Sequence, residues 1–152
     1  MTIQEEAAII ASPKRVVKEI SGSVNGAELR RSFSLKDDHN REYRLFVRRS
    51  GAFPENFSVG IDVVLDNEDL PLRRYNGRHG PNEQLSHHES FHSHNPTWRD
   101  DRRVGKGLRQ IVEEQDYATV EEALTVACQR CTIEGMEDFF PHLGQNELHF
   151  ES

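Results

Sequence analysis

The sequence has few cysteines and no long hydrophobic runs, and both absences exclude whole classes of protein. Only two of its 152 residues are cysteine, Cys128 and Cys131. They lie three residues apart in an expected helix, so they cannot link distant segments as the disulfides of a secreted domain do. No window approaches the roughly 18 consecutive apolar residues of a membrane span, and no signal-peptide pattern opens the chain. We therefore expect a cytoplasmic protein with no membrane partner.

Several sequence motifs of common enzymes are also missing. There is no glycine loop for cradling phosphates, no nucleophile elbow and no HExxH pair, which disfavours the usual nucleotide hydrolases and proteases. No internal repeat or low-complexity tract interrupts the chain. Its 152 residues are close to the commonest domain size, and we expect a single domain over residues 1–152.

The charge is unevenly distributed along the chain. The formal net charge is -7, yet residues 28–49 and 73–106 each carry more basic than acidic side chains, and the second of these segments also holds most of the histidines. Residues 107–152 are strongly acidic. A basic, histidine-rich middle beside an acidic C-terminal third supports either anion binding by the middle or screening of it by the acidic part.

Residues 1–22 are expected to form an N-terminal helical arm. Thr2 and Glu5 have the spacing of a capping box, and a second helical stretch from Lys14 carries Val16, Val17 and Ile20 at helical spacing. Gly22 ends this stretch.

Residues 28–94 are expected to form an antiparallel sheet with a histidine-rich loop. Apolar and polar side chains alternate over 28–36 and 43–48, which predicts a hairpin, and again over 57–65 and 70–75. A short piece at 91–94 suits an edge strand inside the long polar loop of residues 77–106. Residues 107–140 are expected to be helical, with a weak helix over 107–117 and a stronger one over 119–131 that begins at a Thr119/Glu122 capping box. The predicted fold class is α+β, with an antiparallel sheet of four to five strands and helices packed on one face.

The strongest candidate for chemistry is the histidine cluster HHESFHSH, residues 87–94. In an extended segment His92 and His94 point to the same face, where two imidazoles can share a metal or a phosphate. Joined to His79 and the arginines at the end of the fourth strand, they provide the base, the acid and the cations of metal-free RNA cleavage. We expect neither metal nor cofactor, with the candidate residues being catalytic His79, His92 and His94 and substrate-binding Arg74, Asn76 and Arg78.

Three alternatives compete with this interpretation. Cys128 and Cys131 have the mutual spacing of a zinc pair that two histidines would complete, although both fall on the apolar face of a helix, where cysteine acts as a small hydrophobe. The histidine segment can also be a solvated loop whose arginines pair with nearby acids. A further set of arginines in the hairpin can track phosphates or simply line a solvated face of the sheet: Arg30, Arg31, Arg44, Arg48 and Arg49.

The segments LPLRRYNGRHG, from Leu70 to Gly80, and HHESFHSHNPTW, from His87 to Trp98, followed by a helix-forming segment, resemble the TumE-like toxin families of prokaryotic toxin-antitoxin modules. The resemblance covers about residues 70–130 and singles out Arg74, Asn76, His79, His92 and His94, with Asn76 standing where Asp is common. It implies a toxin-like or phage-defence-associated protein that cleaves or binds RNA.

The sequence therefore supports two functions from different classes. The first is a toxin-like, metal-independent ribonuclease that uses histidines and binds RNA. The second is a non-enzymatic, phage- or plasmid-encoded inhibitor that binds a host or defence protein through the acidic face formed by the C-terminal third. An antitoxin is a further expected protein partner of the toxin. The sequence leaves the oligomeric state open.

Overall fold

The computed structural model describes residues 1–78, 90–141 and 143. Its elements follow the chain in this order: α1 (Ile3–Ala11), β1 (Lys14–Asn25), β2 (Glu28–Asp37), β3 (Glu42–Arg49), β4 (Phe57–Leu65), β5 (Glu68–Asn76), β6 (His92–Asn95), β7 (Trp98–Arg99), β8 (Arg102–Arg103), β9 (Gln110–Glu113), α2 (Val120–Arg130), β10 (Ile133–Glu134) and the 3-10 helix η2 (Met136–Asp138).

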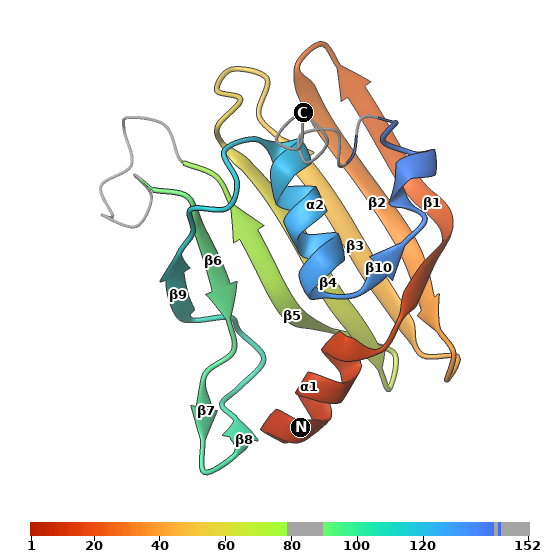
Figure 1. Ribbon diagram of the computed structural model, residues 1–152, viewed down its shortest axis with the longest axis vertical. Coiled ribbons are helices and arrows are strands. Elements are labelled where there is room, and N and C mark those ends of the chain that lie inside the picture. Colours follow the sequence, from red (N-terminus) through yellow and green to blue (C-terminus); the bar gives the residue numbers. More distant parts are fainter. Residues whose placement is uncertain (79–89, 142, 144–152) are drawn as a thin grey trace, which may run out of the picture.

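Eight strands form one sheet in the order β10-β1-β2-β3-β4-β5-β6-β9, and β7 and β8 form a separate two-stranded ribbon. All pairs in the large sheet are antiparallel except β1 and β10, which run parallel. Figure 1 shows α2 lying across one face of this sheet. We call this side the helix face.

The hydrophobic core lies between the helix face and α2. Alternate residues of the central strands point toward α2, and the matching side of α2 presents Ala123, Leu124 and Ala127. α1 lies on the same side, because its buried Glu6 pairs with Arg73, which stands opposite the core residue Ile61 in the sheet. Among the described residues, no helix is long and apolar enough to cross a membrane. The buried strand residues on this side include Phe33, Leu35, Tyr43, Leu45, Val47, Val59, Ile61 and Val63.

The predicted fold class, an antiparallel sheet of four to five strands with helices packed on one face, is wrong. The described residues are mostly sheet, with eight strands in one sheet, two in the ribbon and only two α-helices. The expected hairpin and the third and fourth strands correspond to β2, β3, β4 and β5. The expected helix over 119–131 corresponds to α2, with Glu122 N donating to the Thr119 hydroxyl at 3.1 Å.

The second half of the expected helical arm is a strand, β1. Two β-bulges interrupt its pairing with β2, one between Val16 and Lys18 and one between Glu19 and Ser21. Each bulge adds one residue and reverses which face the following side chains take. The apolar residues of β1 therefore lose the alternation of a regular strand and acquire a spacing that looks helical.

The weak helix expected over 107–117 is also wrong, because residues 110–113 form β9, which pairs with β6. Leu108, Ile111 and Val112 have helical spacing, but residues 110–113 form backbone hydrogen bonds with β6 instead of with their own segment. The short piece expected at the sheet edge, here β6, is thus an inner strand between β5 and β9.

Candidate functional site

The face of the sheet opposite α2 carries most of the residues that the sequence marks as functional. Neither described α-helix lies on it. Because the strands pair in register, residues that stand opposite one another on neighbouring strands share a face. We call this side the arginine face, after Arg30, Arg48 and Arg74.

Two rows of cross-strand neighbours run over the arginine face, from β2 to β9. The first row is Arg30, Arg48, Ser58, Asn76, His92 and Glu113, and the second is Ser32, Phe46, Gly60, Arg74, His94 and Ile111. The rows are two residues apart on each strand, so they are adjacent. Arg74, Asn76, His92 and His94, all predicted from the sequence, therefore meet at the β5–β6 part of one surface.

At the centre of the second row, the backbone of Gly60, the ring of Phe46 and the guanidinium of Arg74 are stacked on one another. A Cβ built on Gly60 would stand 2.1 Å from the Phe46 ring, so the ring lies directly over the backbone of β4. The Arg74 guanidinium carbon is 5.1 Å from the centroid of the same ring, within the range of a cation–π contact. Phe46 thus separates Arg74 from the arginines on β2 and β3.

The two histidines of β6 have different environments. Their rings are 5.0 Å apart between centroids and inclined by 72°. His92 is only 1% exposed, and its Nδ1 lies 2.8 Å from the Ser90 carbonyl oxygen. His94 is half-buried and lines a pocket. Of the two, His94 is therefore the one placed to touch a ligand, while the buried ring of His92 packs beside it.

Asn76 is oriented by contacts from two sides. The Ser58 hydroxyl donates to Asn76 Oδ1 at 2.5 Å, and the Tyr117 hydroxyl lies 3.0 Å from the Asn76 carbonyl oxygen and 2.9 Å from that of His92. Tyr117 sits in an aromatic cluster with Phe57 and Phe91. The backbone of the site is thus tied to the hydrophobic core.

Arg30, Arg48 and Arg74 lie close together on this face, where Arg30 also pairs with Glu28 at 3.3 Å. Burial, together with the positive charges of Arg30 and Arg74, lowers the pKa of the Arg48 guanidinium from its usual value. The Nε of Arg74 is buried and has no hydrogen-bond partner within the described part of the chain. Burial also raises the pKa of the Asp62 carboxyl, against the opposing effect of Arg74, so this acid is a weaker counter-ion. Crowded cations with an unused donor are typical of an anion-binding surface.

Two hollows are lined by residues of the two rows. One has a volume of about 250 Å³ and is lined by Pro71, Arg74, Asn76, His94, Gly107 and Leu108. The other has a volume of about 150 Å³ and is lined by Arg30, Arg31, Ser32, Phe46, Val47 and Arg48. Gly107 and Leu108 belong to the connection between β8 and β9, which forms one wall of the larger pocket. We call this larger hollow the β5–β6 pocket.

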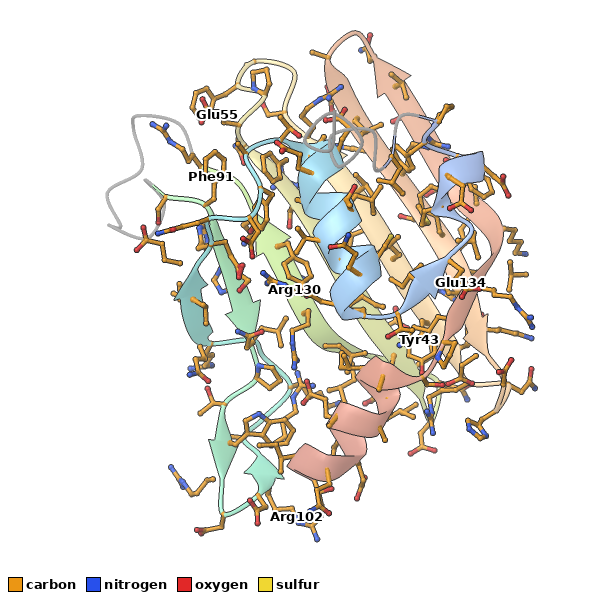
Figure 2. All side chains as sticks on the ribbon, viewed as in Figure 1. Tyr43, Glu55, Phe91, Arg102, Arg130 and Glu134 are labelled. Carbon is orange, nitrogen blue, oxygen red and sulfur yellow. The ribbon has the colours of Figure 1, made fainter. Side chains whose placement is uncertain are left out.

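The structure does not bring every predicted residue to this face. His79 lies outside the described residues. Arg78 follows β5 in an exposed position and pairs with Glu55 at 3.3 Å, in the loop between β3 and β4 (Figure 2). It does not line the β5–β6 pocket.

The predicted arginine stripe splits between the two faces of the sheet. Arg30, Arg44 and Arg48 belong to the arginine face. Arg31 and Arg49 lie on the helix face, where their partners are Glu19 at 2.8 Å and Glu121 at 3.2 Å. A strand alternates its faces, so a run of consecutive arginines cannot act as one surface.

Sequence reasoning missed four residues of the site: Phe46, Ser58, Gly60 and Leu108. Phe46 could have been found from the sequence, because it alternates with the core residues Leu45 and Val47. It therefore points to the same side of the strand as Arg44 and Arg48. This alternation places an apolar ring on the same face as the arginines. The others depend on strand register and on the path of the β8–β9 connection, which local sequence does not specify.

The zinc alternative is not supported by the arrangement of its ligands. Cys131 is buried on the helix face, with its Sγ 3.7 Å from the Tyr75 hydroxyl, whereas His92 and His94 lie on the arginine face. The sheet separates the two pairs. Burial raises the pKa of the Cys128 thiol to about 12, which opposes the thiolate that zinc requires. Within residues 1–78, 90–141 and 143, no three metal-binding side chains cluster.

Comparison with known proteins adds no family or relative: no family model matches the chain, and no curated protein or solved structure matches it. The resemblance to TumE-like toxins stays a prediction. Function is therefore inferred from the geometry of the arginine face.

Proposed function

We propose that this protein binds single-stranded RNA on its arginine face. The observation that carries the proposal is the register of the sheet, which places Arg30, Arg48 and Arg74 on one surface beside Phe46. Arginines on three strands of one face provide a track for successive phosphates. The guanidinium of Arg74, which lies over the Phe46 ring, offers a plane for an unpaired base.

A single strand suits this surface better than a duplex. Duplex RNA is recognised mainly by the shape of its backbone across a groove. An aromatic ring at the centre of the surface makes no contact of that kind. Unpaired bases stack on aromatic side chains and on guanidinium planes, and Phe46 and Arg74 present both within 5.1 Å of each other. As an RNA-binding protein the chain would act in the cytoplasm, where its two free cysteines stay reduced.

RNA cleavage is the second part of the proposal, and the position of His94 favours it. His94 lines the same pocket as Arg74. A neutral imidazole can accept the proton of a 2′-hydroxyl, whose oxygen then bonds to phosphorus as the P–O5′ bond breaks, and the imidazolium or water returns a proton to the leaving 5′-oxygen. A guanidinium can stabilise the charge that develops on the phosphate. His92, buried beside His94, is a positioning residue in this scheme.

Binding is tested with a labelled short oligouridine, 2′-O-methylated to prevent cleavage, by fluorescence anisotropy over a range of salt concentrations. Each of R30Q, R48Q and R74Q is expected to weaken binding and to reduce the steepness of the salt dependence by about 0.7 per lost phosphate contact. The control is R102Q, because Arg102 is exposed on the separate ribbon, away from this face (Figure 2). Equal affinities for the wild type and all four variants would refute the proposal.

Cleavage is tested separately by inducing expression in cells and comparing growth and total RNA. H94A is the sharper variant, because His92 is almost fully buried and its replacement also disturbs folding. The matched control is H39A, an exposed histidine in the turn between β2 and β3. Growth arrest and RNA loss in the wild type and H39A, but not in H94A, are expected. RNA loss that persists in H94A would remove the histidine mechanism and leave RNA binding intact.

The alternative proposal is an inhibitor that binds a host or defence protein through acidic residues. Glu121 and Glu122 begin α2, Glu134 lies on β10, and Glu137 and Asp138 lie on η2, on the side of the molecule that faces the reader in Figure 2. Four of these acids belong to α2 and η2, whereas Glu134 stands opposite Arg15, whose partner on β2 is Lys36 of the arginine face. Charge reversal of these five acids would abolish capture of such a partner and leave RNA binding unchanged, so the two proposals are separable.

A further inference from the structure

The β5–β6 pocket has the lining of a site for one planar base. Its volume of about 250 Å³ is below that of a pocket for a drug-sized ligand, so it suits a single ring system. Pro71 and Leu108 supply apolar surface, and Arg74, Asn76 and His94 supply polar groups. A phosphate ion alone would leave the apolar wall without a contact.

The polar groups of this pocket on β5 are hydrogen-bond donors. Asn76 Oδ1 already accepts the Ser58 hydroxyl from the β4 side, so the amide nitrogen points the other way, toward β6 and the pocket. The guanidinium of Arg74 has only donors and lines the pocket, and His94, whose ring can donate or accept, completes the polar lining. A ligand with two neighbouring acceptors satisfies both donors on β5.

From this donor pattern we infer that the pocket selects an unpaired guanine of the bound RNA strand. Guanine offers O6 and N7 as adjacent acceptors, the pair that arginine recognises most often, whereas adenine offers one acceptor beside a donor. Cytosine also has two adjacent acceptors, O2 and N3, but its single ring fills less of the pocket. The inference rests on the proposed RNA binding and adds the base that is recognised.

The first test changes the ligand and leaves the protein intact. Affinities of the full-length chain are measured for 2′-O-methylated oligouridines that carry one central guanine, inosine, 7-deazaguanine, adenine or cytosine. Guanine and inosine, which keep O6 and N7, are expected to bind about fivefold tighter or more than oligouridine. The 7-deazaguanine strand lacks the N7 acceptor and is expected to return to the oligouridine level.

The second test changes the apolar wall. L108A is expected to reduce the guanine preference and to keep the affinity for oligouridine. Its control is V104A, in the same connection, whose side chain is exposed and does not line the pocket. Free GMP is titrated in parallel, and binding of GMP without binding of any strand would support the base pocket and refute the strand-binding proposal.

The outcomes distinguish a failure of the guanine site from a failure of RNA binding itself. Equal affinity for all five strands, or a preference for adenine or cytosine, would refute the guanine site while RNA binding stands. Failure of every strand and of GMP to bind would refute the proposed function, and the guanine site with it.

Discussion

The ring of Phe46 occupies the space that a side chain at position 60 would need. A methyl group on Gly60 would lie 2.1 Å from one ring carbon and 2.4 Å from another. Phe46 and Gly60 stand opposite each other on β3 and β4, so the glycine is what allows the ring to lie flat. The position of the ring in turn determines where Arg74 can rest.

The first prediction follows from this contact. G60A is expected to lower the free energy of unfolding by about 1–3 kcal/mol, because the added methyl group forces the Phe46 ring out of its place. Chemical denaturation measures this loss. In the F46A background the same substitution is expected to cost much less, since the clash is gone. A loss of equal size in both backgrounds would show that the two residues do not interact.

The second prediction concerns Tyr117, which supports the site without lining its pocket. Its hydroxyl lies within 3.0 Å of the carbonyl oxygens of both Asn76 and His92. Y117F is expected to lower the free energy of unfolding by about 1 kcal/mol and to weaken the guanine preference, because Asn76 is less firmly placed. The affinity for oligouridine serves as the internal control, and it should change little.

The third prediction concerns the buried Lys14, whose ammonium group joins the ends of both helices. Lys14 Nζ donates to the carbonyl oxygens of Ile10 at 2.9 Å, Ser12 at 2.8 Å and Cys131 at 2.7 Å. K14M leaves these acceptors without their donor and is expected to cost about 3 kcal/mol of stability. The exposed Lys18 gives the control, K18M, which should stay within about 0.5 kcal/mol. Similar stabilities for the two variants would contradict the role given to Lys14.

The fourth prediction is the pH dependence that Lys14 confers. Burial lowers its pKa from 10.5 to about 8. Between these values the unfolded chain binds a proton that the folded chain has lost, so the contribution of Lys14 to stability rises with pH. The difference in unfolding free energy between wild type and K14M should therefore be constant below about pH 8 and grow toward pH 10.5. A difference that shrinks over this range would contradict the lowered pKa of Lys14 in the folded chain.

Much of the central sheet could be predicted, because its strands alternate cleanly. β2 and β3 have one more buried and one more polar face, whereas β4 is buried on both faces at its start. The Thr119/Glu122 capping box marks α2. β1 could not be predicted because its two bulges break the alternation. β9 could not either, since four exposed residues at the end of a sheet are stabilised by pairing with β6 and not by their own pattern.

The candidate site was predictable in its polar residues and not in its arrangement. His92, His94, Arg74 and Asn76 stand out as residue types in one segment. Their meeting with Arg48 and Phe46 depends on the register of β3, β4 and β5, which brings together residues almost fifty positions apart in sequence. Local periodicity predicts strands but carries no information on which residues of two strands are opposite.

The bulges of β1 also bear on how copies of this protein behave toward one another. Among the described strands, β10 covers only Lys14 and Arg15 of β1, so most of the outer side of β1 is a free edge that carries the exposed Val17, Ile20 and Val24. A straight strand of this length would be a template for another chain. The two bulges twist β1 and shift its pairing at two places between Val16 and Ser21. We therefore expect an incoming strand to lose its hydrogen-bond register there, which disfavours edge-to-edge association of two copies of the protein.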